Sequence, residues 1–238
     1  MVGYPISLMI LDKLFYDKKN PKDYGHLPTV TLIVVAHNEE KVISKKLHNI
    51  IELEYPKEKI EYLITSDNST DQTNQIVRDF ISKNPDRNIR LFEVKARKGK
   101  TNAQNEAQRT VNSEYLVMTD ANSMLDKNAI KELMSSFTSN DIAYVTGRLV
   151  IVNASTTDVS EAEYNYWDLD IRMRDIESRI QTITAGNGAL YACRNDDYHE
   201  FDLVESHDSA MPIHFALKKK RAIANHDAIA YEKAGIIK

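Results

Sequence analysis

Apolar and polar positions alternate in blocks along the first part of the chain, and each block has the length of a strand or a helix. Runs of strand length that are rich in apolar residues and end in polar ones occupy 28–36, 60–66, 89–96 and 114–120. The first run is continuous rather than alternating, which is typical of a strand buried on both faces of a parallel sheet. Segments with helical spacing of apolar residues follow them, at 41–53, 70–84, 101–111 and 126–137. This order predicts a doubly wound α/β sheet with right-handed crossovers.

After about residue 140 the pattern is less regular. It indicates a pair of strands, a long helix, a strand flanked by glycines, a further helix and a last strand, at 142–152, 159–180, 182–194, 206–221 and 222–232. We predict one domain over 29–238, with an internal boundary near residue 140.

The first residues form an apolar segment of their own. Residues 4–15 read YPISLMILDKLF, about half the length that a membrane-spanning helix needs, and Asp12 and Lys13 interrupt them. The segment lacks the basic start and the small-residue cleavage site of a secretory signal. Two interpretations stay open: a helix that packs on the domain, or a helix that lies at a membrane surface. Residues 1–28 would be this helix and a polar linker.

Composition narrows the class of partner. The chain has 238 residues, of which 42% are hydrophobic, and its formal net charge is -4. A chain without an excess of basic residues lacks the field that attracts nucleic acid, so we predict no nucleic-acid partner. Cys193 is the single cysteine, which excludes a disulfide within the chain and fits a reducing compartment.

Polar residues gather where the predicted parallel strands end. In chain order they are His37, Asn38 and Glu39, then Asp67 and Asn68, then residues 97–100, then Asp120 and Asn122. In doubly wound sheets the ligand crevice lies beyond the carboxyl ends of the strands. We therefore expect these residues to converge on one edge of the sheet.

Residues 97–100 read Arg-Lys-Gly-Lys directly before a predicted helix. Backbone N–H groups, the helix dipole and ammonium groups would together favour an anion such as phosphate. The spacing is not that of a Walker loop, and no GxGxxG follows the first strand, so neither of those nucleotide sites is predicted. A solvated basic turn is the alternative.

Asp120 and Asn122 stand two residues apart in a polar turn, so both can direct an oxygen at one hard cation. Mg²⁺ typically takes one or two protein carboxylates and completes its coordination with water and phosphate oxygens. The alternative is an Asx turn, with Asp126 capping the next helix.

Asp67 can accept a hydrogen bond from a nucleobase, whereas residues 68–71 are typical of a helix cap.

Two acids and a histidine lie close together near the end of the chain, at Glu205, His207 and Asp208. A carboxylate beside a developing alkoxide can act as a general base, and by residue type each of these groups could do so. Capping of the predicted helix is the alternative interpretation.

Several segments, taken in order, carry a resemblance to a known family. They are VVAHNEE (34–40), SDNSTDQT (66–73), KGKTNAQN (98–105), TDAN (119–122) and TAGNGALYACR (184–194). Together they resemble the motifs of family 2 glycosyltransferases with the GT-A fold, which are inverting enzymes that use nucleotide-diphosphate sugars. The resemblance implies a Rossmann-like, doubly wound, mostly parallel sheet with an acceptor-side extension. Residues 29–140 would be its nucleotide-binding half and 141–238 its acceptor and catalytic half.

The resemblance implies donor-binding roles for residues at the strand ends. Asn38 and Glu39 would line the nucleotide crevice, Asp67 would meet the base and Lys100 the diphosphate. Asp120 would also belong to the donor site and, with Asn122, would hold Mn²⁺ or Mg²⁺.

The acceptor side follows from the later motifs. The separation between Asp208 and Arg221 matches the family pattern, so Asp208 would be the base that deprotonates the acceptor hydroxyl. His207 stands where the family usually has Glu and would contact the acceptor. The backbone of Gly186, Asn187 and Gly188 would approach the acceptor closely.

The implied activity is transfer of a sugar, expected from a UDP-sugar, to a hydroxyl of a saccharide or glycolipid acceptor in polysaccharide or cell-envelope synthesis. The enzyme would work at the cytoplasmic face of a membrane, reached through residues 4–15 or through a region that follows Lys238. Ser66, Asn122 and His207 depart from the family pattern, so a catalytically idle member that binds nucleotide sugars is one alternative. A sugar-phosphate nucleotidyltransferase is another, although residues 37–41 lack the glycines that such an enzyme carries there.

Overall fold

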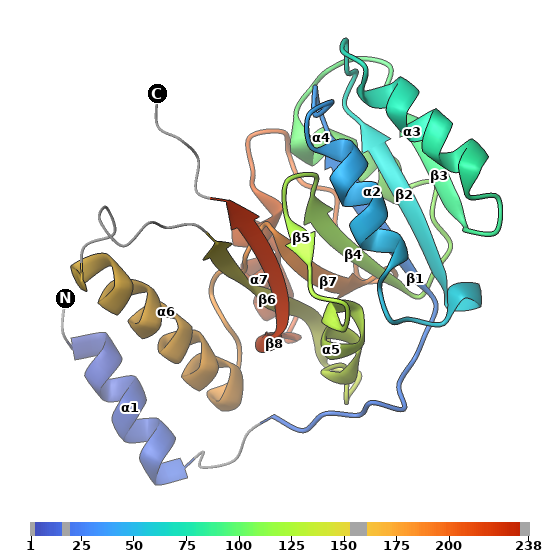
Figure 1. The fold of residues 1–238 in the computed structure, drawn as a ribbon. Helices are drawn as coiled ribbons and strands as arrows, with labels where there is room; N and C mark the ends of the chain where they lie inside the picture. Colours follow the sequence, from blue (N-terminus) through green and yellow to red (C-terminus); the bar gives the residue numbers. More distant parts are fainter. Residues whose placement is uncertain (1–2, 16–19, 153–160, 234–238) are drawn as a thin grey trace.

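The structure, a computed structural model, describes residues 3–15, 20–152 and 161–233 and contains one 8-stranded sheet (Figure 1). The strands lie in the order β3-β2-β1-β4-β7-β6-β8-β5. Their bounds are β1 Val30–Ala36, β2 Ile60–Ser66, β3 Ile89–Glu93, β4 Tyr115–Asp120, β5 Met124–Leu125, β6 Ile142–Val152, β7 Leu190–Arg194 and β8 Arg221–Lys233.

The first half of the sheet is parallel, as predicted. β1 pairs in parallel with β2 and with β4, and β2 pairs in parallel with β3. Ala36 lies beside Ser66, and Val35 lies beside Asp120. The strand ends that carry the polar residues therefore meet at one edge of the sheet, which confirms the expected convergence.

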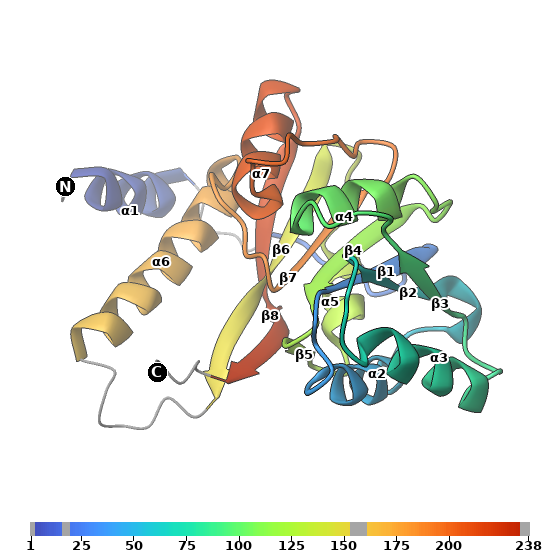
Figure 2. The same cartoon turned by 90° about the horizontal axis from the view of Figure 1, so that it is seen from above.

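Helices cover both faces of the sheet (Figure 2). One face carries α2 (Ile43–Ile51), α3 (Thr73–Lys83) and α5 (Ala129–Ser135), and the other carries α4 (Lys100–Gln108) and α7 (His207–Leu217). Alternate residues of β1 enter different cores: Leu32 shares one with Leu47 of α2, and Ile33 shares the other with Ala107 of α4. Burial on both faces explains the continuous apolar run of β1. A short 3₁₀ helix, η1 (Lys57–Lys59), precedes β2.

The second half of the sheet mixes strand directions. β7 is antiparallel to β4 and to β6, whereas β8 is parallel to β6 and antiparallel to β5. The predicted pair of strands within 142–152 is wrong, because these residues form the single strand β6 with a register shift between Thr146 and Arg148. Gly147 lies at this shift, and a Cβ there would fall 2.6 Å from the Ala228 carbonyl oxygen. The close approach of the two backbones therefore requires glycine.

The N-terminal segment is the helix α1 (Gly3–Phe15), which packs against α6 (Glu161–Ile180). The predicted helix over 159–180 thus lies in α6, and its first two residues fall outside the described part of the chain. Leu8 packs with Met173 and Ile176. Arg179 binds the Asp12 carboxylate through two hydrogen bonds of 2.8 and 2.7 Å. The structure therefore agrees with the first interpretation, in which this helix packs on the domain.

Several apolar side chains of α1 are nevertheless exposed. The exposed ones are Tyr4, Ile6, Met9, Ile10, Leu11 and Leu14. Among the described helices, none is both long enough and apolar enough to cross a membrane. Packing on α6 uses one face of α1, so its other faces stay available to a further surface.

Candidate active site

The turns after β1 and β2 lie side by side at the carboxyl edge of the sheet, and side chains join them. Asn38 and Asn68 have positive φ angles of 55° and 53°, in the left-handed region that asparagine tolerates better than most residues. Asn38 Oδ1 accepts a hydrogen bond from Thr70 N at 2.8 Å, and Asn38 N donates to Ser69 Oγ at 3.1 Å. Asn38 therefore holds the second turn against the first.

Asp71, rather than Asn68, Ser69 or Thr70, reaches the first turn of α3. The helix begins at Thr73, and Asp71 Oδ1 accepts a hydrogen bond from Thr73 N at 2.9 Å. The predicted cap is therefore wrong for the three preceding residues. They lie before the helix and take part in the link between the two turns.

Asp67 supports the loop that carries the predicted phosphate-binding residues. It is 3% exposed, and its carboxylate accepts hydrogen bonds from the backbone N–H groups of Lys98 (3.3 Å) and Gly99 (3.0 Å). Gly99 has φ 96°, a conformation that favours glycine, and α4 begins at the next residue. Asp67 thus sets where the helix N-terminus lies, a contact that the sequence did not reveal.

Lys100 and Asp120 form an ion pair at the centre of this edge. Lys100 Nζ lies 2.5 Å from Asp120 Oδ1 and donates to the Gly188 carbonyl oxygen at 3.4 Å. Both side chains are partly exposed, at 43% and 31%. The predicted diphosphate-binding cation and the predicted metal-binding anion therefore meet directly, and each can be reached by a ligand.

The turn after β4 fits a hard divalent cation that takes most of its ligands from elsewhere. Asp120 offers a carboxylate, and Asn122, which is exposed, offers a neutral amide oxygen. Within the described residues, no group of three or more His, Cys, Asp or Glu side chains could hold a metal ion. A cation here would need water and phosphate oxygens to complete its coordination.

Burial, followed by the charges of Asp120 and Asp71, raises the pKa of the Glu39 carboxyl, as expected for a third acid facing the same edge.

Lys46 of α2 is a functional candidate that sequence reasoning missed. It is fully buried beneath the turn, and burial lowers the pKa of its ammonium to about 7. Its position is three residues after Ile43 and four before Ile50, within the apolar stripe of the helix. A charged residue at such a position was the available signal, because a cation in a core needs polar partners.

Asp208 lies in the first turn of α7, where the helix dipole favours a negative charge. Its Oδ1 accepts hydrogen bonds from Ser206 Oγ and from Ser209 N, the latter at 3.1 Å. Its Oδ2 faces Gly188, where a Cβ would fall 3.2 Å from that oxygen and 3.6 Å from Lys100 Nζ. Asp208, Lys100 and Gly188 line one cavity of about 140 Å³. Gly188 therefore leaves open the space between the predicted base and the predicted diphosphate-binding cation.

The backbone of Asp208 is hydrogen-bonded to the loop that carries Gly186, Asn187 and Gly188, here named the glycine loop. Pro212 lies inside α7 and has no N–H, so the usual helical donor to the Asp208 carbonyl is missing. Gly186 N donates to that carbonyl at 2.7 Å. Gly186 must itself be glycine, since a Cβ would fall 1.9 Å from Tyr144 Oη. The proline and the glycine together hold the loop against the helix that carries Asp208.

Asn187 and Ala189 fasten the same loop to the sheet. Asn187 N donates to Thr146 Oγ1 of β6 at 2.8 Å, and Asn187 Oδ1 accepts from Ala189 N at 2.9 Å. The Ala189 carbonyl accepts from Thr119 Oγ1 of β4 at 2.8 Å. The predicted strand over 182–194 is therefore mostly this anchored loop, and only Leu190–Arg194 forms β7.

His207 lies deeper than Asp208. It is 3% exposed, packs against Tyr198 and Phe201, and places Nδ1 3.3 Å from Tyr191 Oη. Burial, with a smaller effect of the Lys100 charge, lowers the pKa of His207 to about 4. The imidazole is therefore neutral at pH 7, so His207 does not supply the negative charge of the glutamate that the family usually has there.

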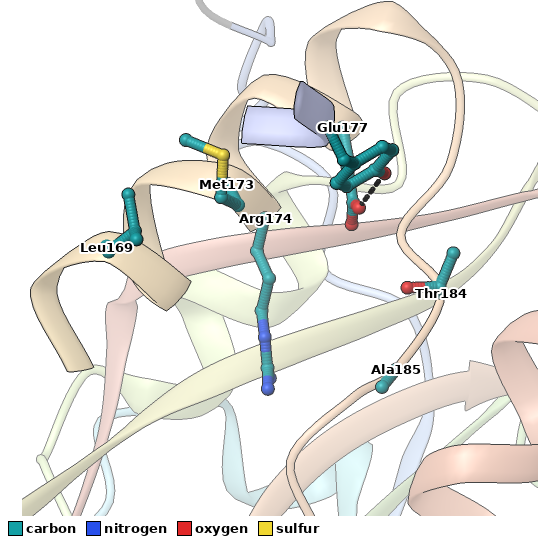
Figure 3. A pocket seen from close by; sticks show the side chains of 7 residues that line it. Leu169, Met173, Arg174, Glu177, Thr184 and Ala185 are labelled. Atoms are coloured by element: carbon teal, nitrogen blue, oxygen red, sulfur yellow. Dashed lines mark hydrogen bonds between the residues drawn. The ribbon is translucent and has the colours of Figure 1, made fainter. Parts of the chain in front are cut away.

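A second cavity, of about 240 Å³, opens beside the glycine loop (Figure 3). Leu169 and Met173 line it from α6, Thr184 and Ala185 line it from the loop, and Tyr4 of α1 and Glu177 of α6, joined by a hydrogen bond, line it as well. Figure 3 shows the Arg174 side chain extending from α6 toward the strands. Arg174 Nη1 donates to the Gly186 carbonyl oxygen at 3.0 Å. This cavity thus adjoins the loop that carries Gly186, Asn187 and Gly188.

Similar sequences point to one family. The profile described as "Glycosyl transferase family 2" matches residues 31–199. The probable glycosyltransferase YdaM of Bacillus subtilis is 33% identical over 149 residues, which cover 60% of this chain and 35% of that protein. Beta-monoglucosyldiacylglycerol synthase of Nostoc sp. is 29% identical over 166 residues, which cover 69% of this chain and 36% of that protein. The chain therefore spans about a third of the length of these relatives.

Solved structures agree on the fold. The mannosyltransferase PcManGT from Pyrobaculum calidifontis, in complex with GDP-Man and Mn²⁺, has a TM-score of 0.83 at 25% identity. The match covers 98% of this chain and 64% of PcManGT. S. aureus TarS in complex with UDP-GlcNAc has a TM-score of 0.63 at 18% identity, over 88% of this chain and 60% of that one. These likenesses confirm the Rossmann-like GT-A fold. With the profile match, they show that the chain belongs to glycosyl transferase family 2.

Proposed function

We propose that this chain is the catalytic part of an inverting glycosyltransferase that moves a sugar from a nucleotide-diphosphate sugar to an acceptor hydroxyl. The meeting of Lys100, Asp120 and Asp208 around Gly188 carries the proposal. Lys100 Nζ contacts both Asp120 and the Gly188 carbonyl, and Asp208 Oδ2 faces the same glycine. A cation for the diphosphate thus contacts a carboxylate for a metal and lines one cavity with a carboxylate for the acceptor.

In the proposed reaction, Asp208 Oδ2 accepts the proton of the acceptor hydroxyl. The hydroxyl oxygen forms a bond to the anomeric carbon on the face opposite the diphosphate. The bond from that carbon to the phosphate oxygen breaks, and the configuration inverts. Lys100 stabilises the negative charge that the departing diphosphate gains. Mn²⁺ or Mg²⁺, when held by Asp120 and Asn122, would supply Lewis-acid stabilisation of the same charge.

A UDP-sugar is the proposed donor, with Asn38, Glu39 and Asp67 near its nucleoside. PcManGT was solved with GDP-Man, so a GDP-sugar is the competing donor to test. Thermal unfolding with a panel of nucleotide sugars, with and without Mn²⁺, separates them, because a ligand that binds the folded chain raises Tm. We expect the largest rise with a UDP-sugar plus Mn²⁺. A larger rise with a GDP-sugar would contradict the preference for uridine.

A lipid-linked acceptor at a membrane surface fits the other cavity and α1. The 240 Å³ cavity beside the glycine loop is lined by Leu169 and Met173 as well as by the charged Arg174 and Glu177. Tyr4 of α1 also lines it, and α1 carries further exposed apolar side chains. An amphipathic acceptor could place its sugar at the loop and its lipid along α1. The similarity to beta-monoglucosyldiacylglycerol synthase supports this class. We place the reaction at the cytoplasmic face of the membrane, where nucleotide sugars are the donors.

Product stereochemistry tests the proposed reaction. Purified protein, Mn²⁺ and a nucleotide sugar would be incubated with a glycerolipid, a polyprenyl phosphate or an oligosaccharide, and the anomeric configuration read by NMR. We expect transfer with a configuration opposite to that of the donor. A retained configuration would contradict the role of Asp208. Nucleotide-sugar binding without turnover on any acceptor would favour the alternative of a catalytically idle family member. Asn122, which replaces a carboxylate of the family motif, would then be one of the changes that accompany the loss of activity.

A further inference from the structure

Lys46 joins the two ends of the turn that carries Asp120 and Asn122. Its Nζ donates to Thr119 Oγ1 at 3.0 Å and to the Ser123 carbonyl oxygen. Thr119 directly precedes Asp120, and Ser123 directly follows Asn122. One ammonium group beneath the sheet edge therefore sets the spacing between the residue before the turn and the residue after it.

The partners of Lys46 continue toward both sides of the site. Thr119 Oγ1 donates to the Ala189 carbonyl, so the hydroxyl that accepts from Lys46 also holds the glycine loop. Ser123 Oγ donates to Glu232 Oε1 of β8. A single chain of hydrogen bonds thus runs from α2 through the turn after β4 to the predicted acceptor loop. The same turn is linked to the last strand.

Packing alone does not account for a lysine at this position. The side chain is 0% exposed, and no ion pair of Lys46 with a carboxylate is formed in the described part of the chain. Asp120 and Glu232 attract its charge from further away. A buried cation without a direct carboxylate partner costs stability, and an apolar side chain of similar length would pack without that cost. The hydrogen bonds to the turn are what the ammonium adds.

We propose that Lys46 is a positioning residue for the donor diphosphate and its metal. By holding Thr119 and Ser123 at a fixed separation, it keeps the side chains of Asp120 and Asn122 directed at one point. Through Thr119 it also fixes the position of the glycine loop relative to them. The inference rests on the proposed function of this site. It assigns Lys46 no contact with the ligand.

Titration calorimetry with UDP and with GDP, each in the presence of Mn²⁺, tests the proposal on Lys46→Met. The variant keeps an unbranched side chain that is one atom shorter and removes the ammonium. We expect the Kd of the Mn²⁺–nucleotide complex to rise about 10- to 100-fold, as is typical when a residue that orients metal ligands is lost. Tm should stay close to that of the wild type, because an apolar side chain replaces a buried charge. Lys45→Met, which removes the neighbouring exposed lysine of α2, should leave Kd unchanged.

Thr119 provides an independent variant pair if Lys46→Met does not fold. Thr119→Val removes the hydroxyl at equal size and should raise Kd, whereas Thr119→Ser keeps the hydroxyl and should not. With both single variants folded, the double variant should lose less affinity than the two single losses together, because each single variant already removes the hydrogen bond between the two residues.

The outcomes separate this inference from the proposed function. A wild-type protein that binds neither nucleotide would contradict the proposed function, and the inference would fall with it. A wild type that binds, together with a folded Lys46→Met of unchanged Kd, would overturn the inference alone. Equal Kd values for Thr119→Val and Thr119→Ser would overturn it as well.

Discussion

The ion pair between Lys100 and Asp120 would govern how a metal and a diphosphate bind at the proposed site. Their charged atoms lie 2.5 Å apart, so each side chain is the counter-ion of the other. A metal at Asp120 has to compete with the Lys100 ammonium, and a diphosphate at Lys100 has to compete with the Asp120 carboxylate. A metal and a diphosphate that arrive together replace both partners at once. The geometry therefore favours joint binding over binding of the metal alone.

Lys100→Gln should affect the two ligands in opposite directions. Removing the competing ammonium should tighten binding of Mn²⁺ alone by up to about fivefold, because exposed ion pairs contribute about 0.2–1 kcal/mol. It should weaken binding of UDP and GDP alike, because their diphosphate loses its cation. Calorimetry with each ligand separately measures both effects. Lys83→Gln, an exposed lysine at the C-terminal end of α3, is the control. Unchanged Mn²⁺ affinity in Lys100→Gln would show that the pair does not hold Asp120.

His207 should make the stability of the fold fall in mild acid. Burial lowers its pKa to about 4, whereas an unfolded histidine titrates near 6.5. Between these values the unfolded chain binds a proton that the folded chain does not, so the free energy of unfolding decreases as pH falls. The loss attributable to His207 should be about 2 kcal/mol between pH 7 and pH 5. Denaturant unfolding at both pH values measures it, with His207→Gln as the comparison. An equal loss in His207→Gln would assign the pH dependence to other groups.

At the scale of single residues, the sequence predicted where site residues lie in the fold better than it predicted their hydrogen-bond partners. Asp67, Lys100 and Asp120 follow parallel strands, so their convergence could be inferred from the β-α order. That Asp67 would support residues 98 and 99 depended on the conformation of Gly99, which the sequence does not reveal. Lys46 was hidden because its position belongs to the apolar stripe of α2. Only the folded chain shows that the Thr119 hydroxyl and the Ser123 carbonyl accept its hydrogen bonds.

At the scale of elements, α7 owes its link to the glycine loop to a missing hydrogen bond. Pro212 leaves the Asp208 carbonyl without its helical donor, and Gly186 N takes that place. The helix gives up local stability, since proline in a helix interior costs about 3 kcal/mol. In return, the backbone of the predicted base is fixed to the predicted acceptor loop.

Pro212→Ala should therefore stabilise the fold and slow the reaction. The new N–H would donate to the Asp208 carbonyl and compete with Gly186 N for it. We expect a higher Tm together with a lower kcat/KM for the acceptor, measured on the same preparation. Pro5→Ala in the first turn of α1 is a control for proline removal away from the site. A higher Tm with unchanged kcat/KM would show that the Gly186 bond does not need the proline.

The elements were predictable where their burial is simple. β1, β2 and β4 are covered on both faces, so each appears as an unbroken apolar run with clear ends. β6 appeared as two strands because Gly147 interrupts the apolar run, and a sequence pattern does not separate a bend in one strand from a turn between two. The loop before β7 appeared as strand because its polar residues are few. Its backbone bonds to Asp208 and Thr146, which lie far away in the sequence, decide its shape.

At the scale of the whole molecule, α1 and α6 form an apolar flank beside the predicted acceptor loop. We expect the purified chain to sediment with lipid vesicles through this flank. Changing Ile6, Ile10 and Leu14 to Ser should lower the vesicle-bound fraction strongly, because each fully buried side chain of this size contributes about 1.5–3 kcal/mol. These three residues are exposed, so the variant should keep its Tm. Changing Leu203, Val204 and Leu217 to Ser, exposed apolar residues elsewhere, is the matched control. Equal binding of both variants would contradict a membrane role for α1.

The central claim for the whole molecule is that Asp208 acts as the base in a site where Lys100 and Asp120 hold the donor. The most direct test compares wild type with Asp208→Asn in two measurements on one preparation: the rate of sugar transfer and the Kd for the nucleotide sugar with Mn²⁺. Asp202→Asn, an exposed acid on the segment before α7, controls for loss of charge nearby. We predict that Asp208→Asn lowers kcat by about 10²- to 10⁴-fold, the usual contribution of a general base, with Kd within a factor of about two of the wild type. Transfer at the wild-type rate by a correctly folded Asp208→Asn would contradict the account.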